Sequence, residues 1–289
     1  MAPWGVLCSL GDLVEDIVVY IATMIARGTD TPASVRRRQG GSAANVAKHA
    51  ALLGTSTTFI GQVGNDPTGA ALVAVLVQAG VRVAAISRGQ TGTIVVLVSP
   101  DGERSFITDR GSAPDLGALP DGCLDGVKYV HVPWYSLAAG PIAHTARQAI
   151  HEARSVGAGL SIDTSSVSLL RDVAANRRAI TELEPDILFA NAAEAAHLNL
   201  LSEPLAGVRL TVIKRGADAA ILVDRKGRTV ASHATAIDIP RLDSTGAGDA
   251  FAAGFLAAIL HGDSDLAAAA AGHDCAAGHL IAQHNQYHP

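Results

Sequence analysis

Apolar positions along the chain fall into short runs that alternate between a strand-like and a helix-like pattern. Runs of four or five apolar residues predict buried strands, and longer runs with apolar residues three and four apart predict helices. The strands are expected at 6–10, 57–60, 129–132, 159–163, 187–190 and 210–214, and the helices at 42–53, 67–79, 142–155, 191–198, 246–260 and 265–281. Such alternation favours an α/β fold, in which a mainly parallel central sheet carries helices on both faces.

Two stretches break this alternation. Residues 12–39 combine β-branched residues with turn formers, and residues 91–108 contain two strand-like runs around a Pro-Asp-Gly turn. We expect both to form a small β lid, which could cover a ligand at the carboxyl ends of the central strands. Two surface hairpins without a role are the alternative. The large α/β domain would then comprise residues 1–11, 40–90 and 109–289.

Composition narrows the class of protein. Aromatic residues make up only 4% of the chain and hydrophobic residues 48%, so small aliphatic side chains must fill the core. A formal charge of −5 gives no basic surface for nucleic acid or for an anionic membrane. The apolar runs are too short to span a bilayer, no signal peptide opens the chain, and three cysteines are too few for a disulfide framework. We therefore expect a cytoplasmic protein with reduced thiols.

The segment with the most chemical information is DSTGAGDAF at 243–251, directly before an apolar helix. Gly246, Ala247 and Gly248 can turn their N–H groups toward one point, at the positive end of the helix dipole. Asp249 follows in the first helical turn. Phosphoryl transfer needs donors that stabilise the moving phosphoryl group and a carboxylate that accepts a hydroxyl proton. The simpler alternative is that Asp249 only caps the helix and that the glycines permit a tight turn.

A second glycine-rich segment, GGSAANVA, opens the first expected helix. Gly40 and Gly41 let the backbone approach a ligand closely, and Asn45 can both donate and accept hydrogen bonds to a polyol. Asp12 and Asp16 follow the first strand, where carboxylates could hold vicinal hydroxyls. A helix cap at Asn45 and ordinary turn residues at the two aspartates are the alternatives.

In this order, these segments resemble the ribokinase/PfkB carbohydrate kinase family over essentially the whole chain. Both family signatures are present, as GGSAANVAKHAALLG at 40–54 and DSTGAGDAF at 243–251. GQVGNDPTG at 61–69, an N-x-x-E motif at 191–194 and KRG at 214–216 also match. The resemblance implies a ribokinase-like α/β domain with a β-sheet lid, which uses ATP and Mg²⁺ to phosphorylate a sugar-like substrate.

The resemblance also implies roles for individual residues. Asp249 would be the catalytic base, and the amides of Gly246, Ala247 and Gly248 would form the anion hole. The substrate-binding residues would be Asp12, Gly40, Gly41 and Asn45. The residues at the nucleotide would be Asn191, Glu194, Lys214 and Gly216, with Glu194 organising Mg²⁺ through water. Asp243 and Thr245 lie where many members place a potassium ion, K⁺.

Two positions depart from the family pattern. Ala219 stands where members often have a glycine in the loop that lines the nucleotide, and its methyl group could crowd that loop. His273 stands in for the asparagine that packs against adenine in many members.

We expect the acceptor to be a hydroxyl, by preference a primary one, of a sugar or sugar acid. Asp12 and Asn45 offer polyol partners, and Arg104 and Arg110 on the expected lid could reach an acidic group, although arginines on such a hairpin more often face solvent. A nucleoside kinase is the alternative within the fold, but it needs an aromatic wall that few aromatic residues can supply. A non-catalytic sugar-binding sensor is the alternative outside the enzymes. The β-branched run at 16–21 would suit a homodimer formed through the lids.

Overall fold

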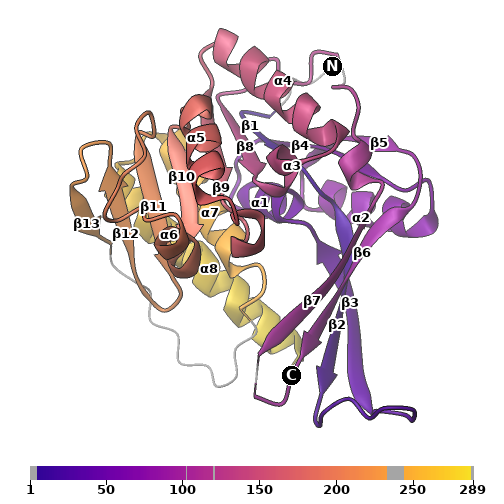
Figure 1. Cartoon of the computed structure of the whole chain (residues 1–289). Helices are drawn as coiled ribbons and strands as arrows, with labels where there is room; N and C mark the ends of the chain where they lie inside the picture. Colours follow the sequence, from indigo (N-terminus) through magenta and orange to yellow (C-terminus); the bar gives the residue numbers. More distant parts are fainter. Residues whose placement is uncertain (1–4, 102, 120, 233–243, 288–289) are drawn as a thin grey trace.

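The computed structural model describes residues 5–101, 103–119, 121–232 and 244–287. Its larger sheet has nine strands in the order β13-β12-β11-β10-β9-β8-β1-β4-β5 (Figure 1). Neighbours pair in parallel from β5 across to β11, and β12 and β13 continue the sheet in antiparallel pairing. The strands are β1 (Leu7–Leu10), β4 (Thr57–Val63), β5 (Arg82–Ser87), β8 (Tyr129–Pro133), β9 (Gly159–Asp163), β10 (Ile187–Asn191), β11 (Leu210–Arg215), β12 (Asp218–Asp224) and β13 (Thr229–Ala231).

Helices cover both faces of this sheet. They are α1 (Ser42–Leu52), α2 (Pro67–Gln78), α3 (Tyr135–Ala138), α4 (Pro141–Ser155), α5 (Val173–Leu183), α6 (Ala192–His197), α7 (Ala247–His261) and α8 (Asp265–Tyr287). Helices α4, α5 and α6 share one apolar core with the sheet, and α1, α7 and α8 share the other. Strand β10 shows the division, because Leu188 and Ala190 enter the first core while Ile187 and Phe189 enter the second. Burial on both faces is what a parallel sheet of this kind requires.

A second sheet of four strands, called the small sheet below, has the order β3-β2-β6-β7. In Figure 1 it extends away from the main sheet on one side. Strands β2 and β6 pair in parallel with Val18 opposite Val96, and the two outer strands pair antiparallel. The two irregular stretches of the sequence therefore build one sheet rather than two separate hairpins. Its strands are β2 (Val14–Ile21), β3 (Ala33–Gly40), β6 (Thr91–Val98) and β7 (Arg104–Gly111).

The structure confirms the α/β fold and each element expected from the periodicity of the sequence, with ends shifted by up to six residues. The sequence did not predict β5, the pair β12 and β13, the short helix α3, or α5. Helix α5 was missed although Val173, Ile180 and Leu183 stand at helical spacing and pack against the core, because its other residues are alanine or polar and form no continuous apolar run. Strands β5 and β13 lie at the two edges of the main sheet, where burial is incomplete and the apolar pattern is weak.

Asp66 ties the small sheet to helix α2. Its Oδ1 accepts hydrogen bonds from the Gly69 N–H at 2.8 Å and from the Thr91 hydroxyl at 2.7 Å, and its Oδ2 accepts the Thr91 N–H at 2.8 Å. These hydrogen bonds, that of the Thr91 hydroxyl foremost, lower the pKa of Asp66. Thr91 is the first residue of β6. The carboxylate that caps α2 thus also anchors the point at which β6 begins.

Polar residues gather where the central strands end. Asp163 ends β9, Asn191 ends β10, and Lys214 pairs with Asn191 near the end of β11. Helices α1 and α7 begin close to the same edge, since Ser42 of α1 and Asp249 of α7 are in hydrogen-bond contact. Because parallel strands bring their carboxyl ends together, this edge is where a ligand site is expected in an open α/β sheet.

The described chain offers no helix that is both long enough and apolar enough to cross a lipid bilayer. The thiols of Cys8, Cys123 and Cys275 are free, and the first two are buried.

Close packing of α7 on α8 generates a prediction about stability. A methyl group at Gly254 would lie 2.5 Å from the Ala271 carbonyl oxygen, so Gly254→Ala must push the two helices apart. We expect this variant to lose about 1–3 kcal/mol of unfolding free energy, as overpacked cores do. The measurement is equilibrium unfolding in guanidinium chloride.

Gly278→Ala is the matched control on α8, because no atom lies within 4 Å of its added methyl group. It should be neutral or gain up to about 1 kcal/mol from the better helix propensity of alanine. Equal effects of the two substitutions would contradict the close contact between α7 and α8.

Candidate active site

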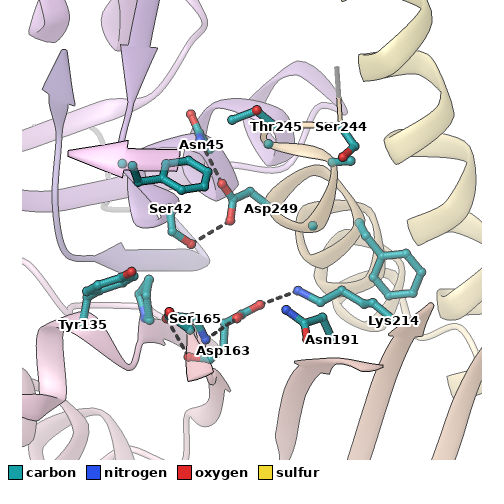
Figure 2. A pocket seen from close by; sticks show the side chains of 18 of the residues that line it. Ser42, Asn45, Tyr135, Asp163, Ser165, Asn191, Lys214, Ser244, Thr245 and Asp249 are labelled. Atoms are coloured by element: carbon teal, nitrogen blue, oxygen red, sulfur yellow. Dashed lines mark hydrogen bonds and ion pairs between the residues drawn. The ribbon is translucent and has the colours of Figure 1, made fainter. Parts of the chain in front are cut away.

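A cleft of about 960 Å³ runs along the carboxyl ends of the parallel strands, beneath the small sheet (Figure 2). Its walls come from the first residues of α1 and α7, the inner faces of β2, β6 and β7, and the middle turns of α8. Most residues singled out from the sequence meet here. The lining includes Asp12, Gly41, Asn45, Asn191, Glu194, Lys214, Gly216, Thr245, Gly246, Ala247, Gly248 and Asp249.

Three of the residues singled out, Gly40, Ala219 and Asp243, are not in this lining. Ala219 lies in β12, where its carbonyl oxygen accepts a hydrogen bond from Arg215 Nε at 2.8 Å. Gly40 is buried at the end of β3, where an added Cβ would lie 2.1 Å from Oδ1 of Asp16. It therefore makes room for Asp16, a carboxylate of the cleft wall. Asp243 lies outside the described residues.

Asp249 stands in the first turn of α7, directly after a turn that only glycine adopts readily. Gly246, the N-cap, has a φ of 82°. The Ala247 N–H donates to the Ser244 carbonyl oxygen at 3.2 Å, and the Ala250 N–H donates to the Gly246 carbonyl oxygen at 2.9 Å. The amides of Gly248 and Asp249 belong to the first turn, which has no helical carbonyl partners. This end of α7 can therefore receive an anion.

The carboxylate of Asp249 is held by helix α1 (Figure 2). Ser42 Oγ donates to Oδ1 at 2.7 Å, and Asn45 Nδ2 donates to Oδ2 at 2.8 Å. Its position inside the cleft, away from bulk water, raises the pKa of Asp249 to about 6, although the two hydrogen bonds oppose this rise. A carboxylate with this pKa can take a proton near neutral pH.

The orientation of Asn45 is set from the small sheet. Gln39 of β3 donates from Nε2 to Asn45 Oδ1 at 2.8 Å, so the Asn45 amide nitrogen is the atom left to face Asp249. Helix α1 can start here because Gly41 takes a φ of 98° and has no Cβ, which would lie 2.2 Å from the Asp12 carbonyl oxygen. The sequence pointed to Gly41 and Asn45 but gave no signal for Gln39 or for Ser42.

A cluster of opposite charges lies beside the start of α7. Lys214 Nζ donates to Asp163 Oδ2 at 2.6 Å, and a methyl group on Gly248 would lie 3.2 Å from that Nζ. Burial alone would lower the pKa of Lys214, but the adjacent Asp163 carboxylate raises it, so the amine stays charged. The sequence did not single out Asp163, although a carboxylate at the end of a buried strand is a usable signal.

Glu194 completes this cluster and is almost fully buried. Its Oε2 accepts the Thr164 hydroxyl at 2.6 Å and the Asn191 N–H at 2.8 Å, and its Oε1 accepts Asn191 Nδ2 at 2.7 Å. Asn191 in turn caps α6 by accepting the Glu194 N–H. Burial first, and then the charge of Asp163, raise the pKa of Glu194. The N-x-x-E motif is thus a capping box that presents a carboxylate to the cleft.

The turn after β9 holds Asp163 in place. Ser165 adopts a φ of 67°, a left-handed conformation that costs a non-glycine residue about 1–3 kcal/mol. Its N–H donates to Asp163 Oδ1 at 2.9 Å, and its hydroxyl accepts the Trp134 N–H at 3.0 Å. Trp134 is buried and donates from Nε1 to Asn176, whereas its neighbour Tyr135 lines the cleft.

The two arginines of β7 point into the cleft, contrary to the expectation that such residues face solvent. Arg110 makes a two-pronged ion pair with Asp12, with Nε 2.6 Å and Nη2 2.8 Å from the two carboxylate oxygens. Arg104 donates to the hydroxyls of Ser244 and Thr245 at 2.7 and 3.0 Å. The expectation was wrong because residues two apart on a strand share a face, and the even-numbered face of β7 covers the cleft.

His273, the expected stand-in for asparagine, also lines the cleft. Its Nε2 lies 3.2 Å from both the Ala220 N–H nitrogen and Ser232 Oγ, and its ring packs edge-on against Phe251 with centroids 5.1 Å apart. The ring therefore connects α8 to β12 and to the loop after β13.

Comparison with known proteins identifies a single family. The family described as pfkB family carbohydrate kinase matches residues 7–284. A fructokinase of Klebsiella pneumoniae is 30% identical, over 92% of this chain and 89% of that one. An ATP-dependent ribose-1-phosphate kinase of Halopiger xanaduensis is 33% identical, over 81% of this chain and 78% of that one.

Solved structures agree on the fold. The adenosine kinase of Sinorhizobium meliloti superposes with a TM-score of 0.82 at 24% identity, over 94% of this chain and 92% of that one. A probable sugar kinase of Rhizobium etli CFN 42 gives a TM-score of 0.83 at 22% identity, over 95% and 92% of the two chains. At these identities the likeness shows the ribokinase-like fold and leaves the substrate open.

The environment of Asp249 generates a prediction about its titration. Removing a donor in Ser42→Ala or Asn45→Ala should raise the pKa of Asp249 above about 6, because each hydrogen bond stabilises the charged carboxylate. Carbon-13 NMR of labelled aspartate carboxyls, with Asp249→Asn to assign the signal, measures this. An unchanged or lowered pKa in both variants would contradict the hydrogen bonds described here.

Proposed function

Because this chain belongs to the pfkB family of carbohydrate kinases, we propose that it transfers the γ-phosphate of ATP to a hydroxyl, by preference a primary one, of a sugar or sugar acid. Family members such as the fructokinases are ATP-dependent phosphotransferases, and this chain is such an enzyme. The observation that carries the finer proposal is the carboxylate of Asp249, half-buried at the start of α7 with a pKa of about 6.

Asp249 acts as the general base. Ser42 donates to one carboxylate oxygen and Asn45 to the other, so each oxygen keeps a lone pair that can take the proton of an acceptor hydroxyl. The hydroxyl gives its proton to Asp249 and attacks the γ-phosphorus in line, while the bond from that phosphorus to the bridging oxygen breaks and ADP leaves on the opposite side. The N–H groups of Gly246 and Gly248 and the charged amine of Lys214 offset the negative charge that develops on the phosphoryl oxygens, whereas the Ala247 N–H, also expected in this role, already donates to the Ser244 carbonyl.

The residues near the phosphates suit Mg²⁺ held through water. Within the described part of the chain, no group of three or more His, Cys, Asp or Glu could hold a metal ion by itself. Mg²⁺ commonly keeps several waters and binds through substrate phosphates, with one or two carboxylates in support. Glu194, with Asp163 beside it, supplies such carboxylates. When bound, the ion would neutralise part of the phosphate charge.

The small sheet serves as a lid over the acceptor. Its inner face brings Asp16, Arg104 and Arg110 to the cleft, with Arg110 at the end where Asp12 lies and Arg104 at the end where Thr245 lies. Arg110 uses two of its five N–H groups on Asp12, so three donors remain for an oxygen-rich acceptor. A closed lid also excludes water and so limits wasteful hydrolysis of ATP. We propose residues 12–39 and 91–108 as the lid and the remainder as the large domain.

A nucleoside kinase is the second candidate, and one observation favours it. The cleft is lined by Phe106 of β7 and by Tyr135, which supply the aromatic faces that the low aromatic content made improbable. Adenosine kinases are among the solved structures with this fold. The acceptor panel described below includes nucleosides for this reason.

We propose that the protein works in the cytoplasm and forms a homodimer. Three free thiols suit the reducing cytoplasm, where ATP is also available. The outer edges of the small sheet, β3 and β7, have unpaired backbone groups, and Val35 and Ile107 on these strands are exposed. Residues 16–21, which the sequence suggested for this contact, belong to β2, an inner strand, so we propose that two copies pair through their lids at β3 and β7. Sedimentation of the purified chain is the direct measurement.

Asp249→Asn should lower kcat by several orders of magnitude, since a general base contributes about 10²–10⁴-fold to such a reaction. Folding and nucleotide binding should persist. ADP release is measured with ATP and Mg²⁺ against pentoses, hexoses, sugar acids and nucleosides. Asp263→Asn, an exposed aspartate beyond the end of α7, is the matched control and should keep full activity. Near-normal turnover by Asp249→Asn would overturn the assignment of the base.

Arg110→Met separates acidic from neutral acceptors. If Arg110 binds an acidic group, kcat/KM for a sugar acid should fall about tenfold or more beyond the loss for the matching neutral sugar, because a charge-assisted hydrogen bond contributes about 1.5–3 kcal/mol. Arg110→Lys keeps the positive charge but not the planar guanidinium group, so its kcat/KM for the sugar acid should lie between the values of the wild type and of Arg110→Met. Equal losses on both acceptors would leave Arg110 as a partner of Asp12 alone.

A further inference from the structure

His279 of α8 lies against the turn that opens α7. Its Nε2 is 2.9 Å from the carbonyl oxygen of Thr245. A Cβ on Gly246 would lie 3.0 Å from the same nitrogen, so the imidazole covers the glycine turn as well as the carbonyl. A carbonyl oxygen can only accept a hydrogen bond, and Nε2 must therefore carry a proton in this contact.

The contact controls the direction of an amide. The Thr245 carbonyl and the Gly246 N–H belong to one peptide unit, and a planar trans peptide directs these two groups to opposite sides. Holding the carbonyl toward His279 therefore turns the Gly246 N–H away from α8. A donor on the carbonyl also polarises the peptide and makes its N–H a stronger donor.

The imidazole of His49 on α1 packs against the imidazole of His279. The two rings meet edge to face, with centroids 4.8 Å apart and an interplanar angle of 86°. Burial first, and then His279 and Lys48, lower the pKa of His49 to about 4, so this ring is neutral near pH 7. Ser42, Asn45 and His49 are three and four residues apart and therefore share one face of α1. One face of α1 thus holds both the carboxylate of Asp249 and, through His279, the turn before it.

The position of His279 bears on the cation expected from the family resemblance. Thr245 was one of the two residues expected at a K⁺ site built mostly from backbone carbonyls. In this chain, the Thr245 carbonyl faces an imidazole N–H instead. A K⁺ ion at this oxygen would compete with that donor, so the residues present do not fit the ion at Thr245.

We propose that His279 is a positioning residue that replaces a monovalent cation at the Thr245 carbonyl, so that phosphoryl transfer by this chain does not depend on K⁺. The inference rests on the proposed kinase function. His279 does not line the cleft and acts through the peptide between Thr245 and Gly246.

The first test needs no turnover. The Kd of ADP with Mg²⁺ is measured by calorimetry in KCl and in choline chloride at equal ionic strength, and we expect values within about twofold. Nitrogen-15 NMR of the histidines, with His279→Gln to assign the signal, should show His279 protonated at Nε2. Markedly tighter binding in KCl, or a neutral ring protonated at Nδ1 alone, would overturn the proposal.

The second test uses turnover. Wild-type kcat should be the same in KCl and in choline chloride. His279→Ala should lower kcat by about tenfold to a hundredfold, somewhat less than the loss of a whole oxyanion donor, while KM for the acceptor stays unchanged. His279→Gln, which offers an N–H at a similar position, should recover part of the loss. The control His261→Ala removes an exposed imidazole from the end of α7 and should have no effect.

Each outcome separates the two proposals. A several-fold rise of wild-type kcat in KCl, or full activity of His279→Ala, would overturn the role of His279 and leave the kinase function intact. Absence of turnover on every acceptor would count against the kinase function, and the binding and NMR measurements would then decide the role of His279 by themselves.

Discussion

The cleft depends on a balance between desolvation and hydrogen bonding at one carboxylate. Withdrawal from water favours the protonated form of Asp249, and the donors Ser42 and Asn45 favour the charged form. The balance exists only because α1 and α7 start at the same place. Helix α1 can start there because Gly41 has no side chain to collide with the backbone of Asp12. A glycine and two short polar side chains thereby set the proton affinity of the site.

A second set of charges lies beside this carboxylate, next to the start of α7. Lys214 is held by Asp163, and Asp163 is held by the left-handed turn at Ser165. The Glu194 carboxylate accepts three hydrogen bonds, one from Thr164 and two from Asn191. These residues come from the ends of neighbouring strands, so the parallel sheet sets their spacing. Hydrogen bonds from the chain itself orient these side chains, which is the preorganisation that electrostatic catalysis requires.

The sequence predicts the core strands well because strands buried on both faces must be apolar throughout. It predicts α5 poorly because alanine and polar residues separate the three larger apolar side chains of that helix. The two glycine-rich segments locate the site, since a helix that opens with glycine is visible in one sequence. Pairs such as Arg110 with Asp12, 98 residues apart, and Lys214 with Asp163, 51 residues apart, are not visible, because nothing in the local pattern shows which distant residue will be the partner.

The anchoring of β6 by Asp66 has a mechanical consequence. Thr91 is tied to α2 at one end of β6, and Gly41 leads directly from β3 into α1, so the base of the small sheet is pinned to the body of the protein. Strands of eight residues are about 26 Å long, so a rotation of about 10° at such a base carries the far ends through about 4–5 Å. The small sheet is a stiff lever with its pivot beside Asp12. Small changes of angle at the hinge become large movements at the tip, while the residues next to the pivot barely shift.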